Sequence, residues 1–478
     1  MMKFCFLFLF WIFYYYKQVE SSKILIISQG NLSHTLMLHG IGKELLSRGH
    51  EVSVIWNSEV EMKELNLYNY KKLYYSTNET TNFKHLQSSI PDFLLGKLSI
   101  EYIFSLEKTP FAATLKIANS ECHAILGNAT LMNKLQSEKY DIAIIDTFPL
   151  TFCTLIIPTT LNIPFVSVSE TLTPWEMRIP FLPFISTRGA NSDEKPSFTK
   201  RFVELLSYVF IVFMRDMFLP SSNFKEFSKY TNYSSFQEII ENSALFLNLQ
   251  DTFITGLYVP KLPNVEFIGG ITISHPKPIE DQTLNQWVSQ ANQGLIVVSF
   301  GSLVSFFPKE IMIKIFKVFG KLNQRVVIRF DQAYSKYKPE NVPENVKLLS
   351  WIPQNDLLGH KNTILFISHA GTNGVYEALY SGVPLLMSST LIPIQGVIAA
   401  RVQTLGCGKI FDIAENDENQ IFDLIGSIIH NNSYKLRAEK ISKLLKHQKP
   451  VLEMLLQKRS NMLLNLVLII SDRKYLIN

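Results

Sequence analysis

Short apolar runs alternate with helical patterns along most of this chain. Lys23–Ser28 (KILIIS) has the length and composition of a buried strand. Apolar residues then recur at helical spacing from Leu36 to Leu46, and Glu51–Trp56 begins another strand. This order predicts a βαβ unit and an α/β fold with parallel sheets. The same patterns predict strands at Tyr140–Asp146, Asn162–Ser169, Leu295–Phe300, Arg325–Phe330 and Asn345–Ser350, and a helix at Ile311–Leu322.

The most informative stretch lies in the second half of the chain. Thr363–Ser368 (TILFIS) predicts a buried strand, and His369–Gly374 (HAGTNG) supplies small residues for a sharp turn. A helical pattern resumes over Val375–Tyr380, and Gly382 followed by Pro384 ends it. A helix that begins at such a turn presents free N–H groups and the positive end of its dipole. The stretch therefore predicts a phosphate-binding site.

Three neighbouring side chains suit a nucleotide. Trp351 offers a flat ring for stacking a base, and Gln354 can bond to the edge of that base. Glu377, expected in the first turn of the helix, is within reach of ribose hydroxyls. Each residue also has an ordinary structural explanation, because a single Trp is usually core and a histidine beside a strand, such as His369, is usually a satisfied polar residue. Their occurrence together and in this order favours a nucleotide site.

Two polar residues stand where predicted N-terminal strands end. His34 follows the first strand and Asp146 ends a later one. Open α/β sheets bind ligands at this edge, and a histidine there can take up a proton near neutral pH. From position alone, however, His34 is more simply a capping or surface histidine and Asp146 a turn former. The turn Gln29–His34 contains no GxGxxG, which argues against a dehydrogenase-type dinucleotide site.

The stretch from Trp351 to Gln395 resembles the signature of the UDP-glycosyltransferase family, and the similarity extends over residues 23 to 430. Members of that family move a sugar from a UDP-sugar onto small lipophilic acceptors. The resemblance implies an α/β fold in the GT-B arrangement, with two facing doubly wound parallel-sheet (Rossmann-like) domains. It also implies an inverting transfer of glucuronate or glucose to an acceptor hydroxyl.

The resemblance further implies roles for individual residues. His34 lies fourteen residues before Arg48 of an Arg-Gly-His, where the family carries its catalytic base. Asp146 matches the carboxylate that orients this base. The matching UDP-sugar-binding residues are Trp351 and Gln354 for uracil, Glu377 for ribose, Gln395 for the sugar, and Ser302, His369, Gly371, Thr372, Asn373 and Gly374 for the diphosphate.

One position departs from the family pattern. The family closes this block with Asp-Gln, a pair that contacts the sugar hydroxyls, whereas this chain has Ile394-Gln395 preceded by an extra residue. A carboxylate accepts charge-assisted hydrogen bonds from hydroxyls, and isoleucine accepts none. The alternative function is therefore a family member that binds UDP or a lipophilic ligand without turnover. The presence of both His34 and Asp146 favours the transferase.

Composition excludes several other classes of protein. The chain has 478 residues, of which 47% are hydrophobic and 18% charged, so it can form two or three well-packed domains. A net charge of +5 without a dominant basic run disfavours nucleic acid as a partner. Cys5 lies in a predicted signal, and the three remaining cysteines (Cys122, Cys153 and Cys407) are far apart, which indicates neither a zinc site nor a disulfide framework. No metal or cofactor is expected.

The N-terminal segment suggests the secretory route, and boundaries along the chain suggest a domain organisation. The apolar run at residues 4–16 predicts a signal peptide and hence the lumen of the endoplasmic reticulum, with an uncleaved anchor as the alternative. Five sequons, at Asn31, Asn78, Asn128, Asn232 and Asn431, fit that route weakly. The predicted plan is a signal peptide (1–22), an acceptor-binding domain (23–260), a linker (261–293), a UDP-sugar-binding domain (294–446) and a divergent tail (447–478).

Two features bear on the acceptor and on membranes. Segments 57–135 and 170–235 are rich in aromatic residues and leucine, which predicts an apolar acceptor pocket with residues 177–186 in its wall. In the tail, the nine-residue apolar run Met462–Ile470 is too short to span a bilayer. Membrane association and a homo-oligomer are both compatible with the sequence.

Overall fold

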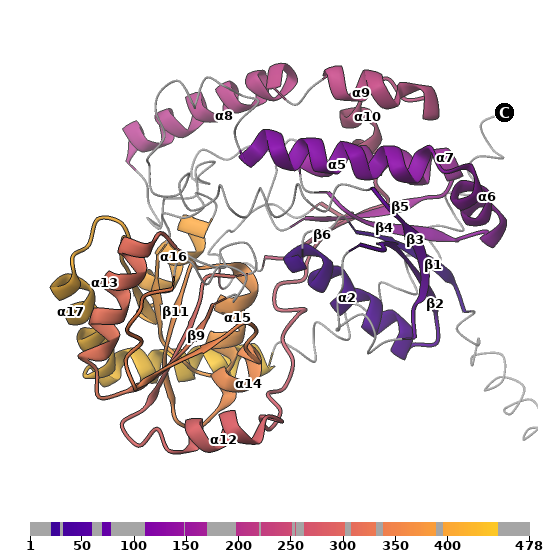
Figure 1. Ribbon diagram of the computed structural model, residues 1–478. Coiled ribbons are helices and arrows are strands. Elements are labelled where there is room, and N and C mark those ends of the chain that lie inside the picture. Colours follow the sequence, from indigo (N-terminus) through magenta and orange to yellow (C-terminus); the bar gives the residue numbers. More distant parts are fainter. Residues whose placement is uncertain are drawn as a thin grey trace, which may run out of the picture.

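The chain forms two α/β halves that lie side by side, the N-terminal half in indigo to magenta and the C-terminal half in orange to yellow (Figure 1). This is a computed structural model, and it describes residues 21–28, 32–59, 69–77, 110–147, 149–169, 197–218, 221–250, 254, 262–301, 307–330, 338–388 and 395–447.

The N-terminal half is built on a parallel sheet of seven strands in the order β3-β2-β1-β4-β5-β6-β7. The order runs outward in both directions from β1 and β4, as in doubly wound folds. The strands are β1 (Lys23–Ile27), β2 (Glu51–Asn57), β3 (Lys71–Tyr75), β4 (Ile142–Asp146), β5 (Phe165–Ser169), β6 (Leu245–Asn248) and β7 (Val265–Phe267).

Helices cover both faces of this sheet. Leu25 and Ile27 point to the face covered by α5, whereas Ile24 and Ile26 point to the face covered by α2. Strands buried on both faces need apolar residues at successive positions, which explains their continuous apolar runs. Figure 1 shows α8 and α9 outside α5, as a further layer. The helices are α2 (Leu32–Ser47), α5 (Pro110–Leu126), α6 (Ala129–Glu138), α7 (Ile156–Leu161), α8 (Phe198–Phe218), α9 (Ser221–Phe227) and α10 (Phe236–Glu241), with 3-10 turns η3 (Pro149–Leu155) and η4 (Ser228–Tyr230).

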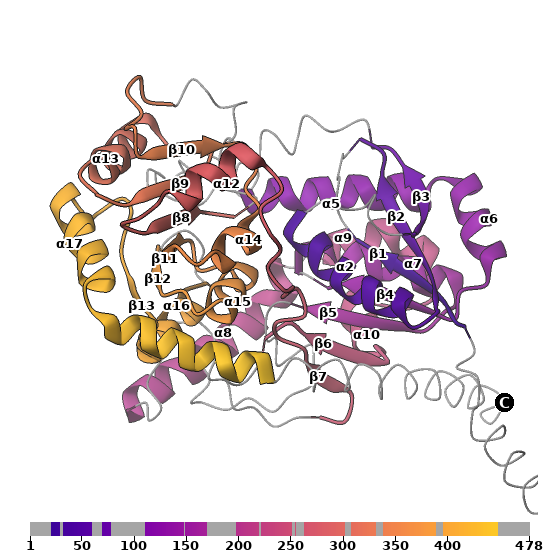
Figure 2. The ribbon, with the colours of Figure 1, turned by 90° about the horizontal axis from the view of Figure 1, so that it is seen from below.

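The C-terminal half repeats the plan with a parallel sheet of six strands in the order β10-β9-β8-β11-β12-β13, as Figure 2 shows from below. Leu295 and Val297 face α12, α14 and α15, and Ile296 and Val298 face α13 and α17. The strands are β8 (Leu295–Ser299), β9 (Arg325–Arg329), β10 (Val346–Leu349), β11 (Thr363–Ser368), β12 (Leu385–Met387) and β13 (Gly408–Ile410). The helices are α12 (Gln282–Ser289), α13 (Lys309–Gly320), α14 (Gln354–Gly359), α15 (Thr372–Tyr380), α16 (Gln395–Thr404), α17 (Glu418–Ile429) and a last helix at 432–447.

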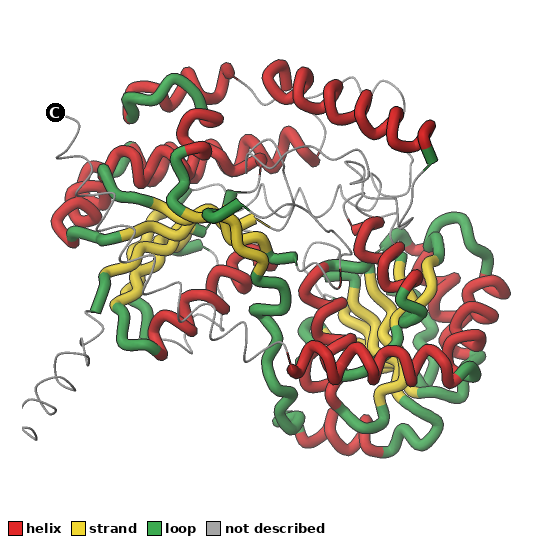
Figure 3. Tube along the Cα trace, turned by 180° about the vertical axis from the view of Figure 1, so that it is seen from behind, coloured by secondary structure: helices red, strands yellow, loops and turns green. Residues whose placement is uncertain are grey.

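The predicted α/β class and the predicted strands are confirmed, and Figure 3 shows the two layered sheets from behind. The region 261–293, expected to be a linker, contains more structure than predicted. Within it, β7 joins the N-terminal sheet and α12 packs on the C-terminal core. The connection that lies outside both elements is therefore residues 268–281.

The sequence indicated no disulfide framework, and the structure corrects this: Cys122 and Cys153 are bonded. The bond joins α5 to η3, and the two Cα atoms are 6.1 Å apart. Both residues lie in the core between the sheet and α5. Thirty-one positions separate them in sequence, so only the crossover through β4 brings them together. Cys407 is buried as a free thiol.

Several predicted features lie outside the described residues. They are most of the signal segment, Ser302, Ile394, residues 177–186, the sequons at Asn31 and Asn78, and all but the first residue of the tail. Within the part of the chain that the structure describes, no helix is both long and apolar enough to cross a bilayer.

Candidate active site

Both sheets place polar residues where their strand order reverses. In the N-terminal half, Ile27 of β1 pairs with Ile145 of β4, so the residues after β1 and at the end of β4 share one edge. In the C-terminal half, Ser299 of β8 pairs with Ser368 of β11 in the same way. Crevices at such switch points are where doubly wound sheets bind ligands. Each half therefore has one site at the expected edge.

The N-terminal site is a histidine–carboxylate pair. His34 Nδ1 lies 2.9 Å from Asp146 Oδ2, and both side chains are buried. His34 lies in the first turn of α2 rather than in the preceding turn, because this helix already begins at Leu32. The bond to Asp146 engages Nδ1 and fixes the orientation of the ring.

The C-terminal site centres on the His369 ring, which packs between two glycines. A Cβ added at Gly371 would lie 2.5 Å from His369 Nε2, and one added at Gly301 would lie 2.7 Å from it. Only glycine leaves room for the ring at either position. Between them, buried Ala370 has a φ of 63°, which is unusual for a residue with a side chain. The small residues of this turn are therefore required by the position of the histidine.

His369 is a neutral side chain at physiological pH. Desolvation by burial lowers its pKa to about 4; the Ser299 backbone beside the ring opposes this effect, and the nearby Arg329 guanidinium adds to it. Its Nδ1 atom is buried and has no hydrogen-bond partner among the described residues. Buried polar atoms are normally satisfied, so an unsatisfied one beside a helix N-terminus marks a place for a ligand.

Helix α15 begins directly after this turn. Gly371 is its N-cap residue and provides no side-chain cap, so the N–H groups of Thr372, Asn373 and Gly374 at the start of the helix have no intrahelical acceptor. This nine-residue helix thus presents the predicted anion-binding end. Because α15 starts at Thr372 and not at Val375, Glu377 lies in its second turn, and the expectation of a first-turn position was wrong.

Glu377 is nevertheless close to the predicted base-binding residues. Gln354, at the start of α14, donates from Nε2 to Glu377 Oε2 at 2.6 Å. Desolvation by burial raises the pKa of Glu377 to about 7, and the Gln354 hydrogen bond partly offsets this effect. Trp351 is 50% exposed, so one part of its ring is open to a stacking partner.

Arg329 was missed by the sequence interpretation. It ends β9, its guanidinium lies 5.1 Å from the centre of the Trp351 ring, and it donates to the carbonyl of Gly301. It therefore connects the predicted uracil and diphosphate positions. The only signal for it was a charged residue at the end of the apolar run RVVIRF.

The connection between the halves contacts α2 on one side and α15 on the other. Thr272 donates to Asn373 Oδ1 at 2.9 Å, and a Cβ at Gly270 would contact the Tyr376 ring. On its other side, Ile271 lies against Gly40 of α2. Residues 270–272 thus lie between the middle of α2, the helix that carries His34 in its first turn, and the start of α15.

Gln395, the predicted sugar contact, begins α16. Its Oε1 atom is buried and has no partner among the described residues, which leaves an acceptor for a hydroxyl. Across the described ranges, no cluster of His, Cys, Asp or Glu is arranged to hold a metal ion.

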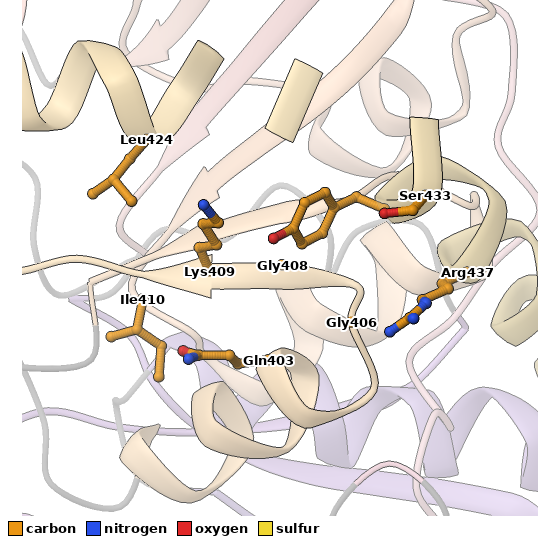
Figure 4. A pocket seen from close by; sticks show the side chains of 9 residues that line it. Gln403, Gly406, Gly408, Lys409, Ile410, Leu424, Ser433 and Arg437 are labelled. Carbon is orange, nitrogen blue, oxygen red and sulfur yellow. The ribbon is translucent and has the colours of Figure 1, made fainter. Parts of the chain in front are cut away.

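A cavity of about 470 Å³ lies apart from these residues, at the β13 edge of the C-terminal sheet (Figure 4). Polar side chains from α16, β13 and the last helix point into it. It contains none of the predicted site residues, and its lining includes Gln403, Lys409, Ser433, Tyr434 and Arg437.

Comparison with known proteins agrees with this geometry. The profile of the UDP-glucuronosyl and UDP-glucosyl transferase family matches residues 22–455. The 2-hydroxyacylsphingosine 1-beta-galactosyltransferase of Mus musculus is 29% identical over 428 residues, which are 87% of this chain and 75% of that protein. The UDP-glucuronosyltransferase 2C1 of Oryctolagus cuniculus is 28% identical over 435 residues, 88% of this chain and 84% of that protein.

Solved structures share the fold at low sequence identity. The glycotransferase of kitacinnamycin superposes with a TM-score of 0.61 at 16% identity, covering 90% of this chain and 96% of its own. The glycosyltransferase VinC in complex with DTDP has a TM-score of 0.59 at 15% identity, covering 91% and 100%. The predicted GT-B arrangement is confirmed. With its paired doubly wound halves and its match across nearly the whole chain, this protein belongs to the UDP-glucuronosyl and UDP-glucosyl transferase family and is a UDP-sugar glycosyltransferase.

Proposed function

We propose that this transferase moves a hexose from a UDP-hexose to a hydroxyl of a small lipophilic acceptor, with inversion at the anomeric carbon. The observation that carries the proposal is the buried His34–Asp146 pair at the switch point of the N-terminal sheet. A protein that only bound UDP would have no use for an oriented base on the half opposite the nucleotide. The alternative of binding without turnover is therefore not favoured.

The donor is proposed to bind the C-terminal half. Trp351 stacks on uracil and Gln354 bonds to its edge, while Glu377 accepts hydrogen bonds from the ribose hydroxyls. The proposal is supported by the 2.6 Å contact between Gln354 and Glu377, which places base and ribose partners together. The diphosphate then accepts hydrogen bonds from the N–H groups at the start of α15, where the helix dipole and the unpaired donors favour an anion. Ser302 is proposed to assist there, as the family resemblance implies.

Transfer follows in one displacement. His34 Nε2 removes the proton from the acceptor hydroxyl, and Asp146 stabilises the imidazolium that forms. The acceptor oxygen attacks the anomeric carbon as the bond from that carbon to the UDP oxygen breaks. The charge that develops on UDP is met by the start of α15 and by a neutral N–H of His369, which acts as a hydrogen-bond donor rather than as a cation. No metal is expected to take part.

The donor sugar is proposed to be glucuronate, glucose or galactose. The first two follow from the family resemblance, and the third from the name of the mouse relative. Gln395 is the proposed contact for sugar hydroxyls, since Ile394 supplies no acceptor. The name of that relative also proposes an acylsphingosine as one acceptor to test, beside simple phenols. The signal-like N-terminus supports placement in the lumen of the endoplasmic reticulum.

The test is UDP release by the purified chain, with each of the three UDP-sugars offered separately over a panel of phenols and a 2-hydroxyacylsphingosine. We expect acceptor-dependent release from one donor and none from His34→Ala. Calorimetric titration with UDP shows that the variant is folded. Folded protein that binds UDP but releases none with any pair would establish the binding-only alternative.

A further inference from the structure

The cavity at the β13 edge of the C-terminal sheet is separate from the candidate active site (Figure 4). Gln403 of its lining lies in the last turn of α16, whereas Gln395, the predicted sugar contact, begins that helix. The rise of a helix from position 395 to position 403 is about 12 Å. The other walls of the cavity come from β13, α17 and the last helix. A ligand in this cavity would therefore leave the donor site free.

The size of the cavity suits a small molecule. Its volume of about 470 Å³ lies within the range of roughly 300–1,000 Å³ that is typical of small-molecule sites. Gly406, in the turn before β13, has a φ of 66°, a conformation that favours glycine. A Cβ added at Gly406 would overlap the Arg437 guanidinium, so only glycine leaves room for that side chain. The turn therefore seats Arg437 in the wall of the cavity.

The cavity carries two positive charges that the protein does not neutralise. Neither Lys409 nor Arg437 forms an ion pair with a carboxylate within the described ranges. Lys409 Nζ instead donates to Ser427 Oγ, a neutral acceptor, at 2.8 Å. By contrast, Lys435 on the same helix as Arg437 lies 3.6 Å from the carboxylate of Glu439. No Asp or Glu is among the described residues that line the cavity, so its potential favours an anion.

Apolar groups in the lining indicate that the anion is organic. Ile410, Leu424 and Tyr434 are half-buried, so each keeps part of its surface open. The Lys409 ammonium lies 6.0 Å from the centre of the Tyr434 ring, which places a cation beside this apolar wall. An inorganic anion would leave the wall in contact with water, whereas an apolar group attached to the anion would cover it. The lining therefore matches an acidic group on a compact apolar body.

We propose that this cavity binds a small organic anion, a carboxylate or a phosphate monoester with a compact apolar body. Its acidic group accepts charge-assisted hydrogen bonds from Lys409 and Arg437. Its apolar body packs against Ile410, Leu424 and the ring of Tyr434. The proposal does not depend on the transferase activity, because binding is measured without transfer.

Calorimetric titration of the full chain with 1-naphthyl phosphate and with 1-naphthoate tests the proposal and shows which acidic group is preferred. Saturating UDP is present throughout, so that neither probe occupies the proposed diphosphate site. The main variant is K409Q/R437Q. The matched control is K440Q/K443Q, which removes two exposed cations of the last helix that do not line the cavity. We expect the main variant to lose at least about tenfold in affinity for the tighter probe, since two charged donors are removed, while the control binds as the wild type does.

A second variant keeps both cations and fills the cavity. Ser433 is an exposed residue of the lining, and Ser433→Phe is expected to weaken binding of both probes because its ring occupies the space of the apolar body. Unchanged circular dichroism and melting temperature verify that each variant is folded.

Three results would overturn the proposal. The first is that neither probe binds the wild type, or that binding survives in both K409Q/R437Q and Ser433→Phe. The second is that K440Q/K443Q weakens binding as much as K409Q/R437Q does, because the probes then respond only to the charge of the surface. The third is that inorganic phosphate binds as tightly as the naphthyl probes, because the cavity then does not select an apolar body.

Discussion

Among single residues, the central feature of the N-terminal half is the contact between two buried side chains, His34 and Asp146. The two lie 112 positions apart in sequence and 2.9 Å apart in space. Asp146 fixes the imidazole through Nδ1 and supplies the charge that a protonated ring needs in a buried place. The proposed role of Asp146 is therefore to position the ring and stabilise its charge, which differs from the proposed role of His34 as the base.

Asp146→Asn should retain the shape of the pair while removing its charge. We expect kcat to fall by about 10²–10⁴-fold, because the imidazolium loses its counter-ion and the amide can select the wrong tautomer. The affinity for UDP should not change, since the nucleotide residues lie in the other half. Steady-state kinetics together with UDP titration checks both statements. A variant with normal kcat would show that the carboxylate is structural only.

The carboxyl group of Glu377 should make nucleoside binding depend on pH. Its pKa is raised to about 7, so the group is largely protonated below that pH and ionised above it. The ionised form accepts stronger hydrogen bonds from ribose hydroxyls, so affinity should rise with pH through this range and then level off.

Uridine is the ligand of choice for this test, because it has no phosphate to titrate. Between about pH 6 and about pH 8 its affinity should increase about tenfold for the wild type, as the ionised fraction of a group with this pKa does. Glu377→Gln should bind uridine with the same affinity at both ends of the range. A slope that persists in the variant would assign the titration to another group.

Among the elements, the turn between β11 and α15 has a conformation that depends on the position of the His369 ring. Gly371 is not in a left-handed conformation, since its φ is −63°, so its requirement is purely steric. The His369 ring occupies the space that a side chain would need. The turn, the histidine and the start of the helix therefore form a single unit, and a change in one displaces the others.

Gly371→Ala should push the His369 ring out of place and disturb the anion-binding end of α15. We expect UDP affinity to fall by about tenfold or more, equivalent to about 1.4 kcal/mol. Gly426→Ala in α17 is the matched control, since its added methyl would meet only an ordinary contact at 3.8 Å. Isothermal titration with UDP compares the two. Equal affinities would mean that the ring relaxes without cost and that the proposed unit does not exist.

The whole molecule consists of two similar halves, and a disulfide bond crosslinks the N-terminal one. The Cys122–Cys153 disulfide joins α5 to η3 behind the N-terminal sheet. It closes a loop of 31 residues, and a crosslink of that size restricts the unfolded chain. The C-terminal half has no part in it.

Reduction of this bond should therefore destabilise the N-terminal half selectively. The expected loss is about 3.7 kcal/mol, as loop-closure entropy gives for a loop of this size, and C122A/C153A should reproduce it. Urea unfolding followed with and without a reducing agent measures the change, and UDP binding by the C-terminal half reports that the other half remains intact. An unchanged unfolding midpoint after reduction would show that the disulfide does not contribute to the stability of the N-terminal half.

Local sequence determined the longer strands, the turn and the family of this protein, but β3, β6, β7, β12 and β13 were not predicted. Continuous apolar runs such as those at β1 and β11 predict buried parallel strands because they must be apolar on both faces. The small residues from His369 to Gly374 predict a backbone turn by their own conformational freedom. The signature from Trp351 to Gln395 identified the family, and the comparisons bear that out. These are properties of neighbouring residues, which a sequence displays directly.

Only the tertiary structure decided which distant residues meet. Strand order set β1 beside β4 and so joined His34 to Asp146, and the same crossover paired Cys122 with Cys153. Arg329 came to the Trp351 ring through the pairing of β9 with β10, in which Arg329 is opposite Leu349. The sequence of α8 shows an apolar stripe but not the direction in which it faces. In the structure the stripe faces outward, because the buried positions of the helix carry polar side chains. Such contacts depend on packing between elements far apart in the chain, and no local pattern contains that information.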